Sequence, residues 1–176
     1  MNLLLHDMKD VTFELPETEG WKVICTDVKA VPFQGCFKCW LKNNGYCIYK
    51  DAFAYSGRER GLSEECFVIS EMTYGGFSAS MKRLFDRSIS KSLPFFTLSK
   101  GEVHHMQRYK GKYPYFFCFY GNSTELEKET ARRYVERVCI NGGNILKGVA
   151  FVDDMESAKN LFLNSLKETE TKKETR

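Results

Sequence analysis

Three cysteines in the first third of the chain have a spacing that suits thiol or metal chemistry. Cys36 and Cys39 form a Cys-x-x-Cys pair, and Cys47 follows shortly after them. A Cys-x-x-Cys pair at the start of a helix can support redox exchange. Zinc and iron–sulfur clusters usually take four ligands, so a metal here needs a fourth ligand from elsewhere or from a second subunit. We therefore interpret the three as structural or vestigial thiols and predict no metal site, with a cluster-containing electron carrier as a weaker alternative.

A second group of candidate residues surrounds two adjacent glycines, Gly75 and Gly76. Glycine adopts backbone angles that other residues resist, and it lets a flat ligand approach the main chain. The neighbouring Tyr74 and Phe77 are flat partners for such a ring. An aromatic residue beside a turn belongs to the core or to an interface about as often. The pattern indicates a site for a planar ring, and core packing stays open for both aromatic residues.

Other polar residues have weaker functional claims. His104 and His105 are adjacent, so their side chains point different ways, and we favour a hydrogen-bonded loop at a subunit interface over an acid–base role. Arg108, close by, is a weak candidate for attracting a nicotinamide phosphate. Lys82 and Asp86 are one helical turn apart and predict an ordinary surface ion pair.

The glycine pair lies between a predicted strand and a predicted helix. The apolar run from Cys66 to Ile69 is typical of a strand that is buried on both faces. Ser78 or Ser80 can cap the helix that follows, whose apolar positions are Met81, Leu84 and Phe85. Strand, glycine turn and helix form half of a βαβ unit, and ligands in open α/β sheets bind at such turns, beyond the carboxyl ends of the strands.

The remaining elements extend this alternation. Further strands are predicted at residues 2–6, 21–26, 113–120 and 145–152, and helices at the Cys-x-x-Cys pair, 49–60, 124–140 and 155–166. The helix from Thr124 begins with a capping box that Glu127 completes. Residues 7–20 are predicted as a loop and 94–113 as a long irregular stretch, a length that is often functional. Alternation of this kind favours an α/β fold, a flavodoxin-like doubly wound five-stranded parallel sheet with helices on both faces.

Length and composition limit the possibilities further. The chain of 176 residues predicts one domain over residues 1–166, followed by a charged tail at 167–176 that we expect to be disordered. A net charge of +3 is too small to argue for nucleic acid or a membrane surface as a partner. The seven cysteines are an odd number and no signal peptide is recognisable, so we expect a cytoplasmic protein.

Several short segments, taken in order, resemble the NADPH-dependent FMN reductase branch of the flavodoxin-like flavoproteins, which includes the iron–sulfur flavoproteins. They cover roughly residues 33 to 152. The matching segments are Gly35-Cys36-x-x-Cys39-Trp40 with Gly45-x-Cys47 and Lys50-Asp51, Tyr74-Gly75-Gly76-Phe77-Ser78 with Met81-Lys82 and Asp86-Arg87, Pro94-Phe95-Phe96 with His104-His105, and Tyr120-Gly121.

The resemblance implies an FMN-dependent oxidoreductase with NAD(P)H as co-substrate. Electrons would pass from the reduced nicotinamide through the flavin to a small acceptor such as a quinone, a nitroaromatic compound or free flavin. The family's ring-binding loops carry over onto Met72, Thr73, Tyr74, Gly75, Gly76 and Phe77 and onto Tyr120, Gly121 and Asn122. No catalytic side chain is assigned. A homodimer or homotetramer is also implied, with the flavin near a subunit boundary.

One departure from the family pattern concerns the phosphate of FMN. The family's first strand leads into a Gly-Ser-Pro-Arg-like loop and a helix whose amides hold that phosphate. Here residues 6–10 read His-Asp-Met-Lys-Asp, and Asp7 and Asp10 repel a phosphate because the charges are alike. The first crossover helix is therefore predicted to be shortened or missing. The alternative function is a degenerate flavodoxin-like binding or assembly module that has lost FMN.

Overall fold

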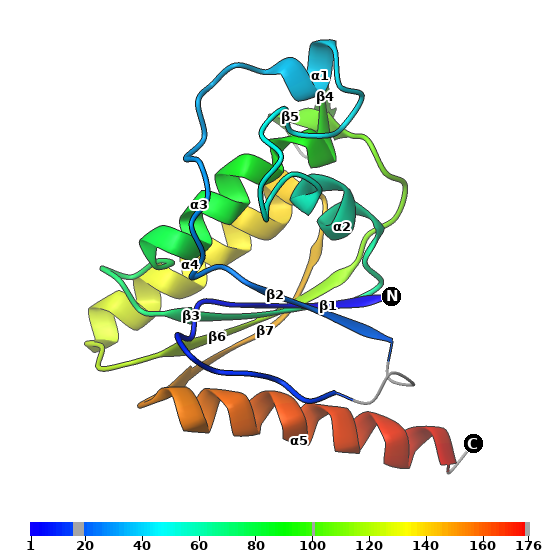
Figure 1. Cartoon of the computed structure of the whole chain (residues 1–176). Coiled ribbons are helices and arrows are strands. Elements are labelled where there is room, and N and C mark those ends of the chain that lie inside the picture. The colour runs from blue at the N-terminus through cyan, green and yellow to red at the C-terminus, as the bar shows by residue number, and fades with distance from the viewer. Residues whose placement is uncertain (16–19, 100, 175–176) are drawn as a thin grey trace.

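A five-stranded parallel sheet forms the centre of the molecule (Figure 1). The computed structural model describes residues 1–15, 20–99 and 101–174, with side chains up to residue 167. The strands are β1 (Asn2–His6), β2 (Trp21–Cys25), β3 (Cys66–Glu71), β6 (Pro114–Tyr120) and β7 (Ile145–Val152), in the order β2-β1-β3-β6-β7. This order confirms the predicted flavodoxin-like α/β fold, and it places β3, with the glycine turn at its end, in the middle of the sheet.

Helices cover both faces of the sheet (Figure 1). They are α1 (Lys38–Leu41), α2 (Ser56–Leu62), α3 (Ala79–Arg87), α4 (Glu125–Gly142) and α5 (Met155–Glu174), with a 3-10 turn η2 (Ser88–Lys91) after α3. Alternate side chains of each strand point to opposite faces. On β1, Leu3 and Leu5 join the core under α3 and α4, whereas Leu4 joins the core under α5. Continuous apolar strands are explained by this burial on both sides.

No helix lies in the described residues 7–15 and 20 between β1 and β2, in agreement with the prediction that the first crossover helix is shortened or missing. Three alternate residues of this segment, Val11, Phe13 and Leu15, pack against the core that α5 covers. Figure 1 shows the segment passing between the sheet and α5. An extended segment thus covers the surface that a helix would bury, and the end of β1 offers no helix N-terminus. Residues 16–19 of the predicted loop lie outside the described residues.

The prediction of an irregular stretch at residues 94–113 is wrong over most of its length. It contains an antiparallel hairpin of β4 (Ser92–Ser99) and β5 (Glu102–Gln107), which forms a separate two-stranded sheet. Gly101 adopts a φ of 81° in the connection between the strands, where glycine avoids strain. In Figure 1 the hairpin and α1 lie together at one end of the molecule.

Two helix boundaries also differ from the prediction, whereas the start of α4 does not. Both hydrogen bonds of the capping box between Thr124 and Glu127 are present. α2 begins only at Ser56, because the Asp51 carboxylate accepts the Phe53 N–H and holds the preceding residues in a turn. α5 continues to Glu174 and so includes most residues of the charged tail. Within the described residues, no helix combines the length and apolar character that a membrane span needs.

Candidate functional site

A buried carboxylate lies where the central strands end. Asp7 follows β1 directly, and its Oδ2 accepts hydrogen bonds from the hydroxyl of Ser70 at 2.7 Å, from the hydroxyl of Ser78 and from the Glu71 N–H at 3.0 Å. The same N–H lies 3.1 Å from Oδ1. Ser78 is the N-cap of α3, so the carboxylate also lies beside the positive end of that helix. The protein's own anion therefore occupies the start of α3.

Further hydroxyls extend this network across the sheet. Thr26, which follows β2, lies 3.0 Å from the Ser80 hydroxyl, and Ser80 lies 3.2 Å from that of Ser78. The Tyr120 hydroxyl, from the end of β6, also interacts with Asp7. Burial raises the pKa of Asp7 above its ordinary value, although these hydrogen bonds oppose the shift. Burial and the neighbouring carboxylate together raise the pKa of Tyr120 far above its usual range.

The end of β1 does not fit the phosphate of FMN. The hydroxyl and N–H donors that face it are already bound to Asp7. The carboxylate repels a phosphate, and residues 7–15 include no helix whose free amides could accept one. A flavin bound at this edge would therefore be held through its ring system rather than through its phosphate.

The glycine pair belongs to a tight turn at the end of β3. Thr73 and Gly76 exchange both backbone hydrogen bonds, at 2.9 and 3.1 Å. The two central residues have positive φ, 50° at Tyr74 and 76° at Gly75, which defines a type I′ turn. A Cβ on Gly75 would lie 2.8 Å from the Thr130 side chain of α4. The φ angle and this contact with α4 account for glycine at position 75 without a ligand.

The two aromatic residues beside the glycines lie in opposite environments. Phe77 is 7% exposed and packs among the rings of Phe85, Phe119 and Tyr134, which favours the core interpretation of this residue. Tyr74 is 92% exposed at the tip of the turn, so its ring is free to meet a ligand.

The structure brings the two predicted ring-binding loops together. The Met72 N–H donates to the Tyr120 carbonyl at 2.9 Å, which joins the loop after β3 to the loop after β6. Gly121 has a φ of 101° with open space beside its Cα, and Asn122 is exposed. The two predicted loops thus lie side by side at the carboxyl edge, and Phe77 is the predicted residue that faces the core instead. Asp7, Ser70 and Thr26 were not among the predicted site residues. Asp7 and Thr26 directly follow strands and Ser70 is the last residue but one of β3, which is the signal that could have revealed them.

Other candidate residues lie away from this edge. His105 stacks on Phe96 and lies against Trp40, while His104 is 3.2 Å from Glu102. Both histidines thus have structural partners on the hairpin. Lys82 and Asp86 form the predicted ion pair.

The cysteine segment is held in place by an arginine on α3. Both Nη atoms of Arg87 bind the Asp51 carboxylate, at 2.8 and 2.9 Å, which clamps the segment after α1 to α3. All seven cysteines are free. Among the described residues, no three His, Cys, Asp or Glu side chains are placed to hold a metal ion, so their geometry gives a cysteine-bound cluster no support.

Comparisons with known proteins identify the class of fold. No family model matches the chain, and no curated protein sequence does. Among solved structures, an azoreductase from Bacillus anthracis str. Sterne is similar with a TM-score of 0.50 and 12% identity, over 96% of both chains. An FMN-dependent NADH-azoreductase from Bacillus anthracis str. Ames Ancestor, in complex with FMN, has a TM-score of 0.49 and 12% identity, over 97% of both chains. At 12% identity the likeness to the first of these structures concerns the fold alone, and it agrees with the flavodoxin-like strand order.

Proposed function

We propose that the protein is a flavin-dependent oxidoreductase that takes electrons from NAD(P)H and passes them to a small acceptor such as a quinone, a nitroaromatic compound or free flavin. FMN is the candidate cofactor. The observation that carries the proposal is the exposed surface at the carboxyl edge, where the turn with Tyr74 and the open backbone at Gly121 lie on adjacent loops. Ligands of doubly wound sheets bind at this edge.

A bound flavin supplies the hydride acceptance and the electron transfer. The chain supplies binding and orientation. Tyr74 offers an exposed aromatic face, and the backbone at Gly121 and Asn122 offers polar groups for the edge of the ring. Asp7 binds the hydroxyls of Ser70 and Ser78, which lie on either side of the turn in the sequence. No side chain of this surface is assigned an acid–base role.

A second candidate function is that of a flavodoxin-like binding or assembly module without a flavin. The observation that favours it is Asp7, which occupies the start of α3 where a phosphate would be expected. The structural role of Gly75 against α4 points the same way. The two candidate functions make different predictions for flavin binding.

Titration of the purified protein with riboflavin and with FMN, followed by flavin fluorescence, separates the two. The first proposal predicts that both flavins bind and that FMN binds no more tightly than riboflavin, because the phosphate gains nothing at β1. Tyr74→Ala should weaken both, whereas Tyr55→Ala, which removes another exposed tyrosine, should leave both unchanged. If neither flavin binds, the binding-module function replaces the first proposal.

We also propose that the hairpin of β4 and β5 contacts a second copy of the chain in a homodimer or homotetramer. Its exposed apolar side chains support this, because isolated monomers rarely present so many together. They are Phe95, Phe96, Leu98, Val103 and Met106. Light scattering coupled to size exclusion should show an oligomer that the double variant F95D/L98D converts to a folded monomer. A wild-type monomer would contradict this arrangement.

A further inference from the structure

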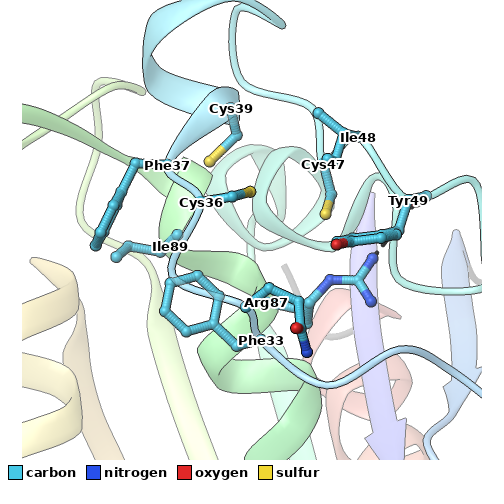
Figure 2. A pocket seen from close by; sticks show the side chains of 10 residues that line it. Phe33, Cys36, Phe37, Cys39, Cys47, Ile48, Tyr49, Arg87 and Ile89 are labelled. Carbon is cyan, nitrogen blue, oxygen red and sulfur yellow. Dashed lines mark hydrogen bonds between the residues drawn. The ribbon is translucent and has the colours of Figure 1, made fainter.

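A pocket lies at the opposite end of α3 from the glycine turn. Its walls come from the segment before α1, the segment after it and the last turn of α3, and they include Phe33, Tyr49 and Arg87 together with Cys36, Cys39 and Cys47. Figure 2 shows the three sulfur atoms facing the same space, with the Arg87 guanidinium below Cys47. α3 has nine residues and is therefore ~13 Å long, so this pocket is distinct from the carboxyl-edge surface.

The three thiols differ in what they can do. Cys36 is exposed, so a molecule in solution can reach its sulfur. Cys47 is half-buried, and its thiol interacts with the Arg87 guanidinium. Cys39 is buried, and burial raises the pKa of its thiol, which makes it a poor nucleophile near neutral pH. Cys36 is therefore suited to react with a molecule from solution, and Cys47 is suited to react with Cys36 from inside the pocket.

Arg87 provides a second, independent sign that the pocket is built for an anionic sulfur. Its side chain is only 1% exposed, and its Nε is buried without a hydrogen-bond partner. Its Nη atoms are fixed by Asp51 and by the Val31 carbonyl. The Arg87 guanidinium lies within reach of the Cys47 thiol, so it can pair with that sulfur during exchange, in which a thiolate attacks a disulfide.

We propose that this pocket is a thiol–disulfide exchange site that reacts with low-molecular-weight disulfides, of which glutathione disulfide is the test compound. The Cys36 thiolate attacks one sulfur of the disulfide and releases one thiol, leaving a mixed disulfide on Cys36. The Cys47 thiolate then attacks the Cys36 sulfur and releases the second thiol. Two cysteine thiols are oxidised to one protein disulfide, the small disulfide is reduced to two thiols, and the two protons from the cysteines pass to the released thiolates.

Formation of a Cys36–Cys47 disulfide closes a loop that contains α1. This loop carries Trp40, whose indole N–H donates to the Ser92 carbonyl at 2.9 Å and whose ring lies against His105 of the hairpin. The redox state of the pocket would therefore act on the segment that contacts β4 and β5. The site does not depend on flavin binding at the carboxyl edge.

The test is incubation of the reduced protein with glutathione disulfide, followed by alkylation of the remaining thiols, trypsin digestion and mass spectrometry. Lys38 separates Cys36 from Cys39 and Lys42 separates Cys39 from Cys47, so each possible disulfide gives a different pair of linked peptides. The expected product links the peptide of Cys36 to that of Cys47, with two glutathione molecules released per protein.

Three variants test the order of events. Cys47→Ser should stop at a glutathione adduct on Cys36, Cys36→Ser should give neither adduct nor link, and Cys39→Ser should still form the Cys36–Cys47 link. The half-buried Cys25 serves as an internal control that should stay reduced. A Cys36–Cys39 link in place of the expected one overturns the assignment of Cys47. Unmodified Cys36, or modification no faster than at Cys25, overturns the site itself.

Discussion

Replacement of Asp7 tests whether its carboxylate holds the ends of the central strands together. Asp7→Ala leaves three donors without their acceptor: the hydroxyls of Ser70 and Ser78 and the Glu71 N–H. At a net contribution of about 1 kcal/mol for each hydrogen bond, the loss is about 3 kcal/mol. Relief of the buried charge, seen in the raised pKa of Asp7, offsets part of this, so about 3 kcal/mol is the upper end of the expected loss.

Asp7→Asn is the matched variant, because it keeps one acceptor oxygen and the side-chain shape. Its amide must face a donor, so we expect a smaller loss of about 1 kcal/mol in the free energy of unfolding. Urea unfolding followed by circular dichroism measures both variants. The reasoning is refuted if Asp7→Ala unfolds at the same urea concentration as the wild type, since three buried donors would then have lost nothing.

The same Asn variant has a functional readout. It removes the negative charge that a phosphate would meet at the end of β1, while riboflavin carries no phosphate. At an effective dielectric constant of about 20, one charge pair contributes on the order of 1 kcal/mol, so the ratio of FMN affinity to riboflavin affinity should rise roughly fivefold. An unchanged ratio would mean that the phosphate does not approach Asp7.

Three further predictions concern stability and follow from burial. Burial lowers the pKa of His6 to about 4, so on acidification the unfolded chain binds this proton at a higher pH than the folded chain does. The free energy of unfolding should therefore fall by about 3 kcal/mol between pH 6.5 and pH 4. An equally steep dependence in His6→Phe would contradict this. Phe77→Ala should cost about 3–5 kcal/mol and Tyr74→Ala less than about 0.5 kcal/mol in urea unfolding, and equal costs would refute the assignment of the first to the core. Asp51→Ala leaves the guanidinium of Arg87 buried and unpaired, so it should cost about 3 kcal/mol or more, and a loss below about 1 kcal/mol would show that the clamp is dispensable.

The elements that could be predicted are those whose signals are local. Apolar runs and their alternation with helices gave the five parallel strands, and the pair Thr124 and Glu127 marked the start of α4. The hairpin was missed because its apolar side chains lie on the surface, so their pattern does not follow a buried face. The periodicity of buried residues reveals neither an exposed sheet nor an interface between subunits.

The candidate site was predictable only in part, for a related reason. The loops after β3 and β6 were identified because they follow buried strands, and Asp7 was identified as a charge that repels phosphate. Its partners Ser70 and Ser78 are brought to it by the fold from distant positions in the sequence. The sequence does not show why position 75 is a glycine, whereas the structure gives a reason in the close approach of Thr130 from α4.

The most direct test of the central proposal is an NMR titration of the isotope-labelled protein with riboflavin, which follows each backbone amide separately. Binding at the carboxyl edge should shift the amides of residues 72–77 and 120–122, while those around Cys36 and Cys47 keep their positions. Shifts confined to other parts of the chain, or a spectrum that riboflavin leaves unchanged, would contradict a flavin site on this surface.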